Sequence, residues 1–409
     1  MIRYKILDLS DERGQLTSKI LADLGCQVIQ IERPGGDHAR SVGPFYNNEP
    51  DPENSLTWWA FNTSKKGMTL DITTPEGKEV FLKLAKDADA VIETYAPGYL
   101  DSLGLGYEDL KKINKGIVLT SITPFGQYGP YVDEGYKGGD LVLWALGGVM
   151  YSQGYPDRAP NRLNTPQTFL HTSLMACAGT LAALYGRNAT GEGDHVDCAA
   201  MEATGHLMMY EPLGWTYEHN IQKRVGSKSY RGVKLLRQVW ECKDGMVAMR
   251  LVNNKQSRTL KPLVEWMTEL GEPGVETINH YDWDDLPLYD MADEEIGHIE
   301  DVWAQFFKKH TKKELFEEAL KRRYDLTPVQ NCEDLINDEQ LIARGFFEEV
   351  EHEDLGKRFI YPGNPFKTSS ELYHITGRAP HIGENNEEIL RSLGYGDKDI
   401  ATLKEGGII

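Results

Sequence analysis

Short apolar runs alternate with helical patterns at the start of the chain, and this alternation constrains the fold more than any other feature. Residues 4–10 and 28–31 are predicted strands, and residues 13–24 between them carry apolar side chains at helical spacing. Gly25 is typical of a helix end. A strand, a helix and a second strand in this order favour parallel pairing with a right-handed crossover.

The alternation continues along the first part of the chain. Thr74, Pro75 and Glu76 form a helix start, with a capping hydroxyl, a proline in the first turn and an acid near the positive end of the helix dipole. Residues 90–94 and 116–122 are two further predicted strands. The pattern predicts an α/β fold whose sheet has helices on its faces.

Later segments indicate a second, smaller domain. Residues 168–185 are nearly all apolar or small, which predicts a helix buried in the core. A Lys-Asp-Gly turn at 243–245 lies between two strand-like pieces and suggests a hairpin, and amphipathic helices follow it. We expect a large α/β domain over 1–215, a small α+β domain over 226–330, and a return to the large domain over 331–409.

Charge and cysteine content exclude several classes of protein. The 409 residues carry a formal net charge of −19, which argues against a nucleic-acid partner. No run of about 18 apolar residues occurs, so we expect no membrane span. The five cysteines are scattered, without a C-x-x-C pair, which argues against a disulfide framework or a zinc site and favours the cytoplasm.

The common catalytic and nucleotide motifs are absent, and a group of cations remains. The chain has no G-x-G-x-x-G after its first strand, no P-loop, no G-x-S-x-G and no H-E-x-x-H, so we expect no metal. Arg33 and Lys65 lie beside predicted strand ends, and Lys137 precedes an apolar helix. Ligands of open α/β sheets bind outside the carboxyl ends of the strands, where such groups could hold a phosphate. The alternative is that they are solvated surface charges.

Two titratable residues in apolar surroundings have two readings each. His171 lies one turn into the apolar helix, where a histidine is more often a core residue than a catalyst. Asp140 precedes an apolar run, and is either an acid at a helix start or a carboxylate in a pocket.

Several short segments in a fixed order resemble the class III CoA-transferase family, also called CaiB/BaiF. These segments are residues 24–37, 62–66, 70–71, 74–77, 125–130, 190–193, 344–347, 379–380 and 383–384. The resemblance implies a Rossmann-like large domain built from both chain ends, a smaller α+β middle domain and an interlocked dimer. It also implies coenzyme A thioesters as substrates, no further cofactor, and contacts to CoA from Arg33, Lys65, Tyr95 and Lys137.

The chain departs from the family at the residue that carries the chemistry. The family uses an Asp at the start of the core helix, whose carboxylate attacks the acyl-CoA thioester, and this chain has Phe169 there. Phenylalanine offers no nucleophile. The family's Ala-Gly-Pro after the first strand is also replaced, by Asp-Glu-Arg-Gly at 11–14, and a cationic position is Ser102 here.

Three hypotheses fit this departure. In the first, the chain is one subunit of a heteromeric transferase, and a homologous partner carries the Asp. The segment 166–171 is similar to such subunits from anaerobic toluene breakdown, which implies CoA transfer from an acyl-CoA such as succinyl-CoA to a carboxylic acid such as benzylsuccinate. In the second, the chain is a self-sufficient homodimeric transferase or racemase that uses His171 or Asp140. In the third, it is a non-catalytic CoA-binding scaffold.

Overall fold

The computed structural model describes residues 4–231 and 233–409, which form two compact units. The first unit combines residues 1–150, 162–221 and 339–409. The second combines 151–161 and 222–338, so it is larger than the expected 226–330 and includes a segment that we had assigned to the large domain.

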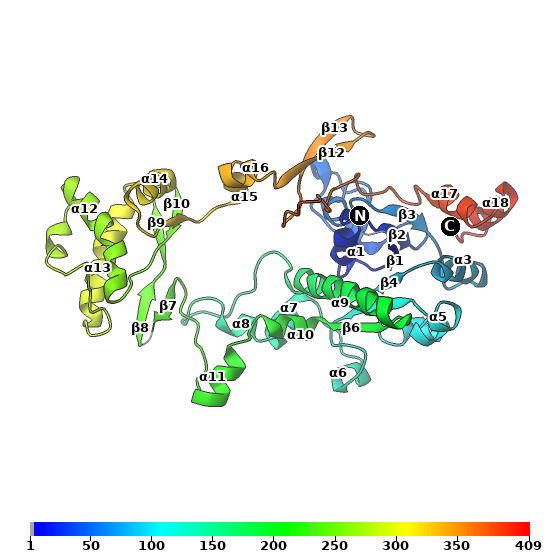
Figure 1. Ribbon diagram of the computed structural model, residues 1–409, viewed down its shortest axis with the longest axis horizontal. Coiled ribbons are helices and arrows are strands. Elements are labelled where there is room, and N and C mark those ends of the chain that lie inside the picture. The colour runs from blue at the N-terminus through cyan, green and yellow to red at the C-terminus, as the bar shows by residue number, and fades with distance from the viewer. Residues whose placement is uncertain (1–3, 232) are drawn as a thin grey trace. The chain divides into compact units, whose positions relative to one another are not determined.

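A six-stranded parallel sheet forms the centre of the first unit (Figure 1). Its strands, in chain order, are β1 (Lys5–Leu9), β2 (Gln27–Glu32), β3 (Lys66–Thr69), β4 (Ala90–Glu93), β5 (Val118–Thr123) and β6 (His195–Ala199). All five neighbouring pairs are parallel, and the spatial order is β3-β2-β1-β4-β5-β6. The expected α/β sheet is therefore confirmed. Its strand order reverses between β1 and β4, as in Rossmann folds.

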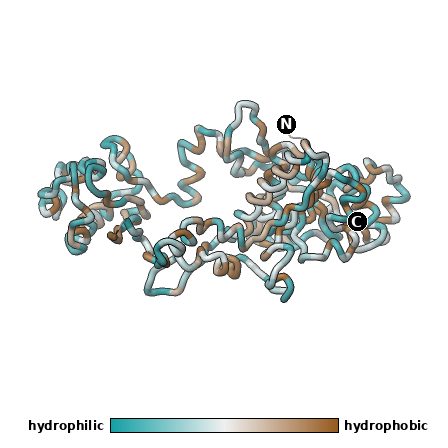
Figure 2. The backbone as a smooth tube through the Cα atoms, turned by 60° about the horizontal axis from the view of Figure 1, so that its bottom comes forward, coloured by the Kyte–Doolittle hydropathy of each residue, from teal (hydrophilic) through white to brown (hydrophobic). Residues whose placement is uncertain are grey.

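Helices cover both faces of this sheet and enclose two apolar cores. The helices that flank it are α1 (Gln15–Asp23), α3 (Pro75–Lys86), α5 (Tyr107–Ile113), α9 (Thr168–Thr190), α17 (Asn386–Ser392) and α18 (Asp397–Glu405). The first core contains Leu21 of α1 and Leu184 of α9, whereas the second contains Phe81 of α3 and Leu390 of α17. In Figure 2, apolar stretches run through the interior of this unit, which also holds both chain ends.

Local signals explain where the helices begin and end. The Thr74 side chain accepts a hydrogen bond from the Gly77 amide, and Pro75 is the first residue of α3, which confirms the predicted start. The helix α9 ends at Gly191, whose φ of 71° lies in the left-handed region that favours glycine.

The apolar helix α9 is buried on one side only. It packs against α1, α10, β5 and β6, while Leu174, Met175 and Tyr185 are exposed. The prediction of a helix enclosed on all sides is therefore wrong for the single chain. Among the described residues, α9 is also the one helix with the length and composition of a membrane span, although a core helix of a soluble protein can have the same composition.

Shorter elements complete the first unit. They are α2 (Leu56–Phe61), α4 (Tyr99–Ser102), α6 (Pro130–Asp133), α7 (Asp140–Leu146), α8 (Val149–Ser152), α10 (Ala200–His206), α11 (Glu211–Glu218), α16 (Glu339–Ala343) and the antiparallel hairpin of β12 (Phe347–His352) and β13 (Lys357–Pro362). The hairpin and α2 share a small core that contains Trp58, Trp59 and Tyr361.

The second unit is an α+β domain with its own core. The predicted hairpin is confirmed as β9 and β10, which pair antiparallel across the Lys-Asp-Gly turn. Its elements are β7 (Lys228–Arg231), β8 (Lys234–Arg237), β9 (Val239–Cys242), β10 (Gly245–Ala248), α12 (Lys261–Glu269), α13 (Asp293–Phe307), α14 (Lys312–Arg322), β11 (Thr327–Pro328) and α15 (Cys332–Ile336). Aromatic residues such as Trp240, Trp303 and Phe307 fill the core.

Candidate functional site

The loops after β1 and β4 meet at the point where the strand order reverses. The Arg13 guanidinium pairs with the Asp11 carboxylate at 2.6 Å and donates a hydrogen bond to the Thr94 carbonyl at 2.7 Å. The Asp11 amide donates to the Thr94 hydroxyl at 3.0 Å. These contacts join two loops that are about 80 residues apart in sequence. They lie at the carboxyl edge of the sheet, here called the crevice, where folds of this strand order bind ligands.

Tyr95 lies on the β4 side of this crevice, where the family resemblance predicted a ligand contact. Its ring packs against Tyr99 with a centroid distance of 4.8 Å, and its amide donates to the Glu93 carboxylate at 2.6 Å. Glu93 is buried, and this burial raises the pKa of its carboxyl to about 7. The Tyr95 ring is therefore held in place after β4, against Tyr99 and the edge of the second apolar core.

Arg33 follows the carboxyl end of β2 and is exposed. Its Nε donates to the Gly36 carbonyl at 3.4 Å, which leaves the terminal nitrogens free for an anion. Asp37, four residues further on, is mostly buried, and burial together with nearby acids raises its pKa to about 6. Arg33 thus supplies the positive charge on this side of the crevice.

Lys65 occupies a different kind of position from Arg33, because its side chain is buried. The ammonium lies 2.9 Å from the Asp8 carboxylate and also donates to the Gln15 carbonyl, Gln30 and Asn62, at 3.1, 3.1 and 2.7 Å. A lysine has three donors, and these four acceptors use all of them. In this structure Lys65 supports the floor beneath the crevice, and it offers no free donor to a ligand.

Lys137 is exposed on the segment between α6 and α7, which follows β5. Arg33 follows β2, and β1 and β4 lie between β2 and β5. At about 4.8 Å per strand, the ends of β2 and β5 are roughly 14 Å apart. The strand ends that precede these two cations are therefore well separated along the sheet edge.

Phe169, which the family resemblance assigns to the nucleophile position, is packed in an apolar cluster. It lies in the first turn of α9 and contacts Leu143 of α7 and Ala200 of α10, with Phe125 and Met201 at the edge of the cluster. The neighbouring Thr168 hydroxyl is buried and makes no hydrogen bond. The start of α9 is thus apolar where a nucleophilic carboxylate would be solvated by polar groups.

Asp140 and His171 lie close to the same helix start. Asp140 begins α7, and its carboxylate accepts a hydrogen bond from the Thr168 amide at 3.1 Å while its other oxygen pairs with Arg162 at 3.5 Å. His171 is hydrogen-bonded to the backbone of Ala203, and its Nε2 is buried without a partner. Burial, together with the charge of His206, lowers the pKa of His171, which keeps its ring neutral.

Sequence reasoning missed several residues that the fold brings into this region. Arg13 and Glu93 belong to different strand ends, and Ser121 of β5 is hydrogen-bonded to His195 of β6 at 2.9 Å. A parallel sheet aligns the carboxyl ends of its strands, so the polar residues after β1 and β4 were detectable from the predicted strands alone. The side-chain pairings between them were not. Within the described residues, no group of three or more His, Cys, Asp or Glu side chains could hold a metal ion.

The strand order of the parallel sheet is that of a Rossmann-type fold. The sequence matches CoA-transferase family III over residues 4–386. The chain therefore belongs to this family of enzymes, as the motifs had indicated.

Individual relatives extend over nearly the whole chain. The succinyl-CoA:(R)-benzylsuccinate CoA-transferase subunit BbsE of Thauera aromatica is 32% identical over 407 residues, which cover 100% of this chain and 97% of that protein. The succinyl-CoA:mesaconate CoA-transferase of Haloarcula hispanica is 28% identical, covering 96% of each chain. Among solved structures, a CaiB/BaiF family protein from Brucella suis superimposes with a TM-score of 0.81 at 25% identity, over 95% of this chain and 98% of that one.

Proposed function

We propose that the chain is one subunit of a heteromeric CoA-transferase, and that a homologous partner subunit supplies the nucleophilic Asp. The proposed reaction transfers CoA from a succinyl-CoA-type donor to an aryl-substituted dicarboxylic acid such as benzylsuccinate. The observation that carries the proposal is Phe169, a buried aromatic ring at the start of α9. Without a carboxylate there, the covalent acyl and CoA intermediates of the family reaction cannot form.

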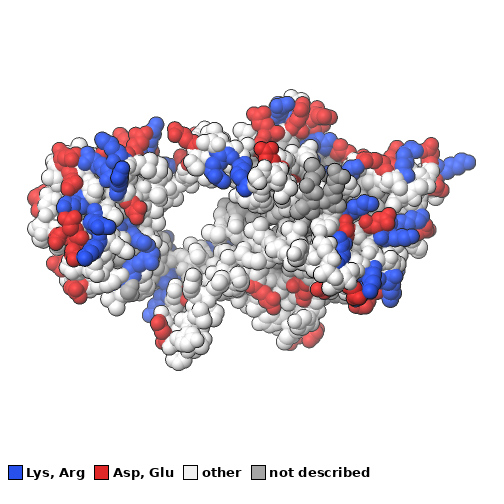
Figure 3. Space-filling view, in the orientation of Figure 1, with Lys and Arg blue, Asp and Glu red and all other residues white. Residues whose placement is uncertain are grey.

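Unpaired apolar surface on the first unit supports a partner chain. The helix α11 has no buried residue, although Leu213, Trp215 and Tyr217 lie on it. An eight-residue helix is marginal in water by itself, so its apolar side chains need a surface to pack against. Leu174 and Met175 of α9 are also exposed apolar side chains, which a partner surface would cover. Figure 3 shows that the surface around α11 is mainly uncharged.

A pocket beside the Phe169 cluster supports an aromatic substrate. It has a volume of about 510 Å³ and is lined by aromatic and apolar side chains that include Phe125, Tyr131 and Met201. Phe125 and Met201 also border the apolar cluster around Phe169. A phenyl group fits such a lining because aromatic rings and methionine pack favourably against it. The 32% sequence identity with BbsE, a subunit of a succinyl-CoA:(R)-benzylsuccinate CoA-transferase, also supports an aryl-substituted acid as substrate.

Activity measurements with and without the partner test the proposal. The purified chain alone should not exchange CoA between succinyl-CoA and benzylsuccinate. Co-expression with an Asp-bearing homologue encoded in the same operon should give a complex that does. If the chain alone exchanges CoA at the rate of the complex, the heteromeric proposal is wrong.

One observation favours a second candidate, in which the chain acts alone through Asp140. The Asp140 carboxylate lies at the amino terminus of α9, where it accepts a hydrogen bond from the amide of Thr168, the residue before Phe169. Both of its oxygens are engaged, by an amide and by Arg162, which stabilises the carboxylate and weakens it as a nucleophile. We therefore rank this candidate second, and a CoA-binding scaffold without turnover third.

We also propose a cytoplasmic location for the complex. All five cysteines are free thiols, and Cys26 and Cys177 are buried. Free thiols are the state that a reducing compartment maintains.

A further inference from the structure

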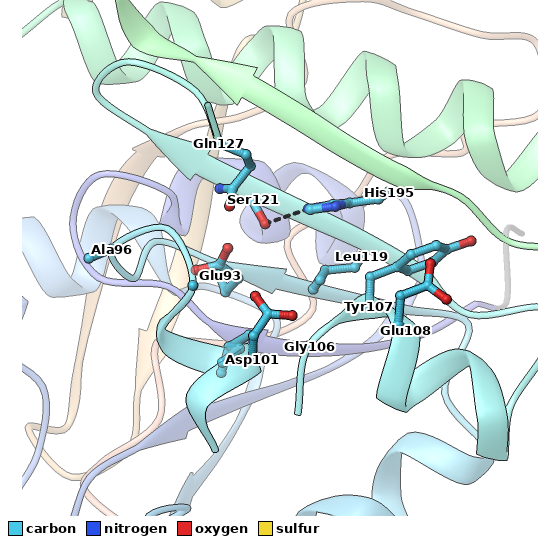
Figure 4. A pocket seen from close by; sticks show the side chains of 12 residues that line it. Glu93, Ala96, Asp101, Gly106, Tyr107, Glu108, Leu119, Ser121, Gln127 and His195 are labelled. Carbon is cyan, nitrogen blue, oxygen red and sulfur yellow. Dashed lines mark hydrogen bonds between the residues drawn. The ribbon is translucent and has the colours of Figure 1, made fainter. Parts of the chain in front are cut away.

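A polar pocket lies beneath the loop that follows β4 (Figure 4). It has a volume of about 180 Å³, and its lining includes Glu93, Asp101, Tyr107, Gln127 and His195. In Figure 4 the carboxylates of Glu93 and Asp101 point into the same space. The reaction proposed above uses none of these side chains.

Glu93 links this pocket to the crevice. Its side chain is 4% exposed, and its carboxylate accepts the Tyr95 amide at 2.6 Å. That amide belongs to the residue whose ring packs against Tyr99 and the edge of the second apolar core. The segment then turns at Gly98, which has a φ of 78° and begins α4. The Glu93 carboxylate therefore fixes the backbone from which the Tyr95 ring projects.

A row of polar residues continues from Glu93 across the sheet. Ser121 of β5 is the register partner of Glu93 of β4, and the Ser121 hydroxyl is 2.9 Å from His195 Nε2. The His195 ring stacks on Tyr107 at a centroid distance of 5.7 Å. This arrangement is not that of a hydrolytic triad, because Glu93 lies beside the serine and not the histidine, and Ser121 is 1% exposed.

We propose that Glu93 is a positioning residue for CoA binding, and that its hold on the Tyr95 amide depends on the protonation of its carboxylate. This inference rests on the proposed contact between Tyr95 and CoA. The ionised carboxylate accepts the Tyr95 amide in a charge-assisted hydrogen bond, which is about twice as strong as a neutral one. Protonation of Glu93 weakens that bond and loosens the segment.

The charged groups around Glu93 come from every element packed on it. The pKa of Glu93 is raised to about 7, mainly by burial; the Arg13 charge after β1 acts against this rise, and the Asp101 charge of α4 adds to it. Burial lowers the pKa of His195, against the raising effect of Asp197 and Asp101. His195 is therefore neutral when Glu93 titrates, and the carboxylate is the group whose charge changes.

The direction of the pH dependence separates positioning from charge repulsion. If Glu93 positions Tyr95, acidification from pH 8 to pH 6 weakens CoA binding, by about threefold to tenfold for the loss of one charge-assisted hydrogen bond. If Glu93 acts on CoA only by repelling its phosphates, acidification strengthens binding. Calorimetric titration of the full chain with coenzyme A at several pH values distinguishes the two.

Two variants test the assignment to this carboxylate. Glu93→Gln keeps the shape and should bind CoA with the low affinity of the wild type at pH 6, at every pH. Asp37→Asn should keep the pH dependence of the wild type, although Asp37 also titrates near neutrality. A Glu93→Gln variant that keeps the wild-type pH slope, or a wild type whose affinity is constant or rises on acidification, overturns the proposal.

A measurement without CoA keeps this inference separate from the proposed function. In the chain labelled with ¹⁵N-tyrosine, the Tyr95 amide is assigned by its absence in Tyr95→Phe. The chemical shift of this amide should change with pH in the wild type, with a midpoint near pH 7. In Arg13→Gln the midpoint should move to higher pH, because a nearby positive charge that lowers the Glu93 pKa is lost. A Tyr95 amide that does not titrate refutes the positioning role. A wild type that titrates but binds no CoA refutes only the proposed function.

Discussion

The Lys65 ammonium lies 2.9 Å from the Asp8 carboxylate, and neither side chain is exposed. The two residues tie the segment before β3 to β1 beneath the candidate site. The family resemblance predicts that Lys65 contacts CoA. In the structure, its ammonium is instead held by an ion pair and hydrogen bonds inside the protein.

Replacing Lys65 should therefore destabilise the fold. Lys65→Met leaves Asp8 buried without its partner, and breaking a buried ion pair costs about 3–5 kcal/mol. Lys66→Met is the matched control, because Lys66 is exposed and its pair with Glu388 lies at the surface, where the change should be within about 0.5 kcal/mol. Urea unfolding measures both. Equal stabilities of the two variants would contradict a structural role for Lys65.

The role of Arg33 is tested by CoA affinity. Arg33→Gln removes an exposed guanidinium at the carboxyl end of β2 and with it a charge-assisted hydrogen bond to phosphate. We expect CoA binding to weaken by roughly 10- to 100-fold, from a loss of about 1.5–3 kcal/mol. Arg358→Gln, on the β12–β13 hairpin, should leave the affinity unchanged. Unchanged binding in Arg33→Gln would remove Arg33 from the site.

Two substitutions at the start of α9 distinguish the proposed mechanisms. Asp140→Asn should not abolish the activity of the heteromeric complex, because the partner carries the nucleophile. If Asp140 were the nucleophile, the substitution should lower kcat by several orders of magnitude. Phe169→Asp is the complementary change, and CoA exchange by the variant alone would show that the surrounding pocket is still competent.

Gly14 allows the backbone after β1 to pass close to the side chains of Ser10 and Thr94. A Cβ at this position would lie 2.7 Å from the Ser10 Cβ and 2.8 Å from the Thr94 Cγ2. Gly14→Ala should therefore cost about 1–3 kcal/mol through overpacking. Gly297 in α13 has open space around it. Gly297→Ala should therefore raise the free energy of unfolding by about 0.5–1 kcal/mol, because glycine weakens a helix interior. Thermal unfolding of both variants checks the opposite signs.

The acid Asp37 should make stability depend on pH. Its folded pKa of about 6 is above the ordinary value of 3.8 for an aspartic acid, so the folded chain binds the proton more tightly than the unfolded chain. This group then stabilises the fold at low pH, and its contribution is lost as pH rises from about 4 to 6. Asp37→Asn cannot ionise, so its free energy of unfolding does not fall in this way. Relative to the wild type, the variant should become more stable by about 1–2 kcal/mol between pH 4 and pH 7. A constant difference across this range would show that Asp37 has an ordinary pKa.

The sequence by itself determined the parallel sheet, most of its helices and the hairpin of the second unit. Hydrophobic periodicity, helix caps and turn residues act within a few positions, so the start of α3 at Pro75 and the pairing of β9 with β10 were readable locally. The assignment of Phe169 to the nucleophile position stays a prediction from the family resemblance.

Only the tertiary structure decided which side chains meet. It buried Lys65 against Asp8, placed the Asp140 carboxylate on the Thr168 amide and joined Glu93 to the Tyr95 amide. It also left one face of α9 exposed, although the residues on that face are apolar. The physical reason is that periodicity specifies which face of an element is apolar, whereas contacts between distant segments depend on sheet order, register and the surfaces that other chains cover.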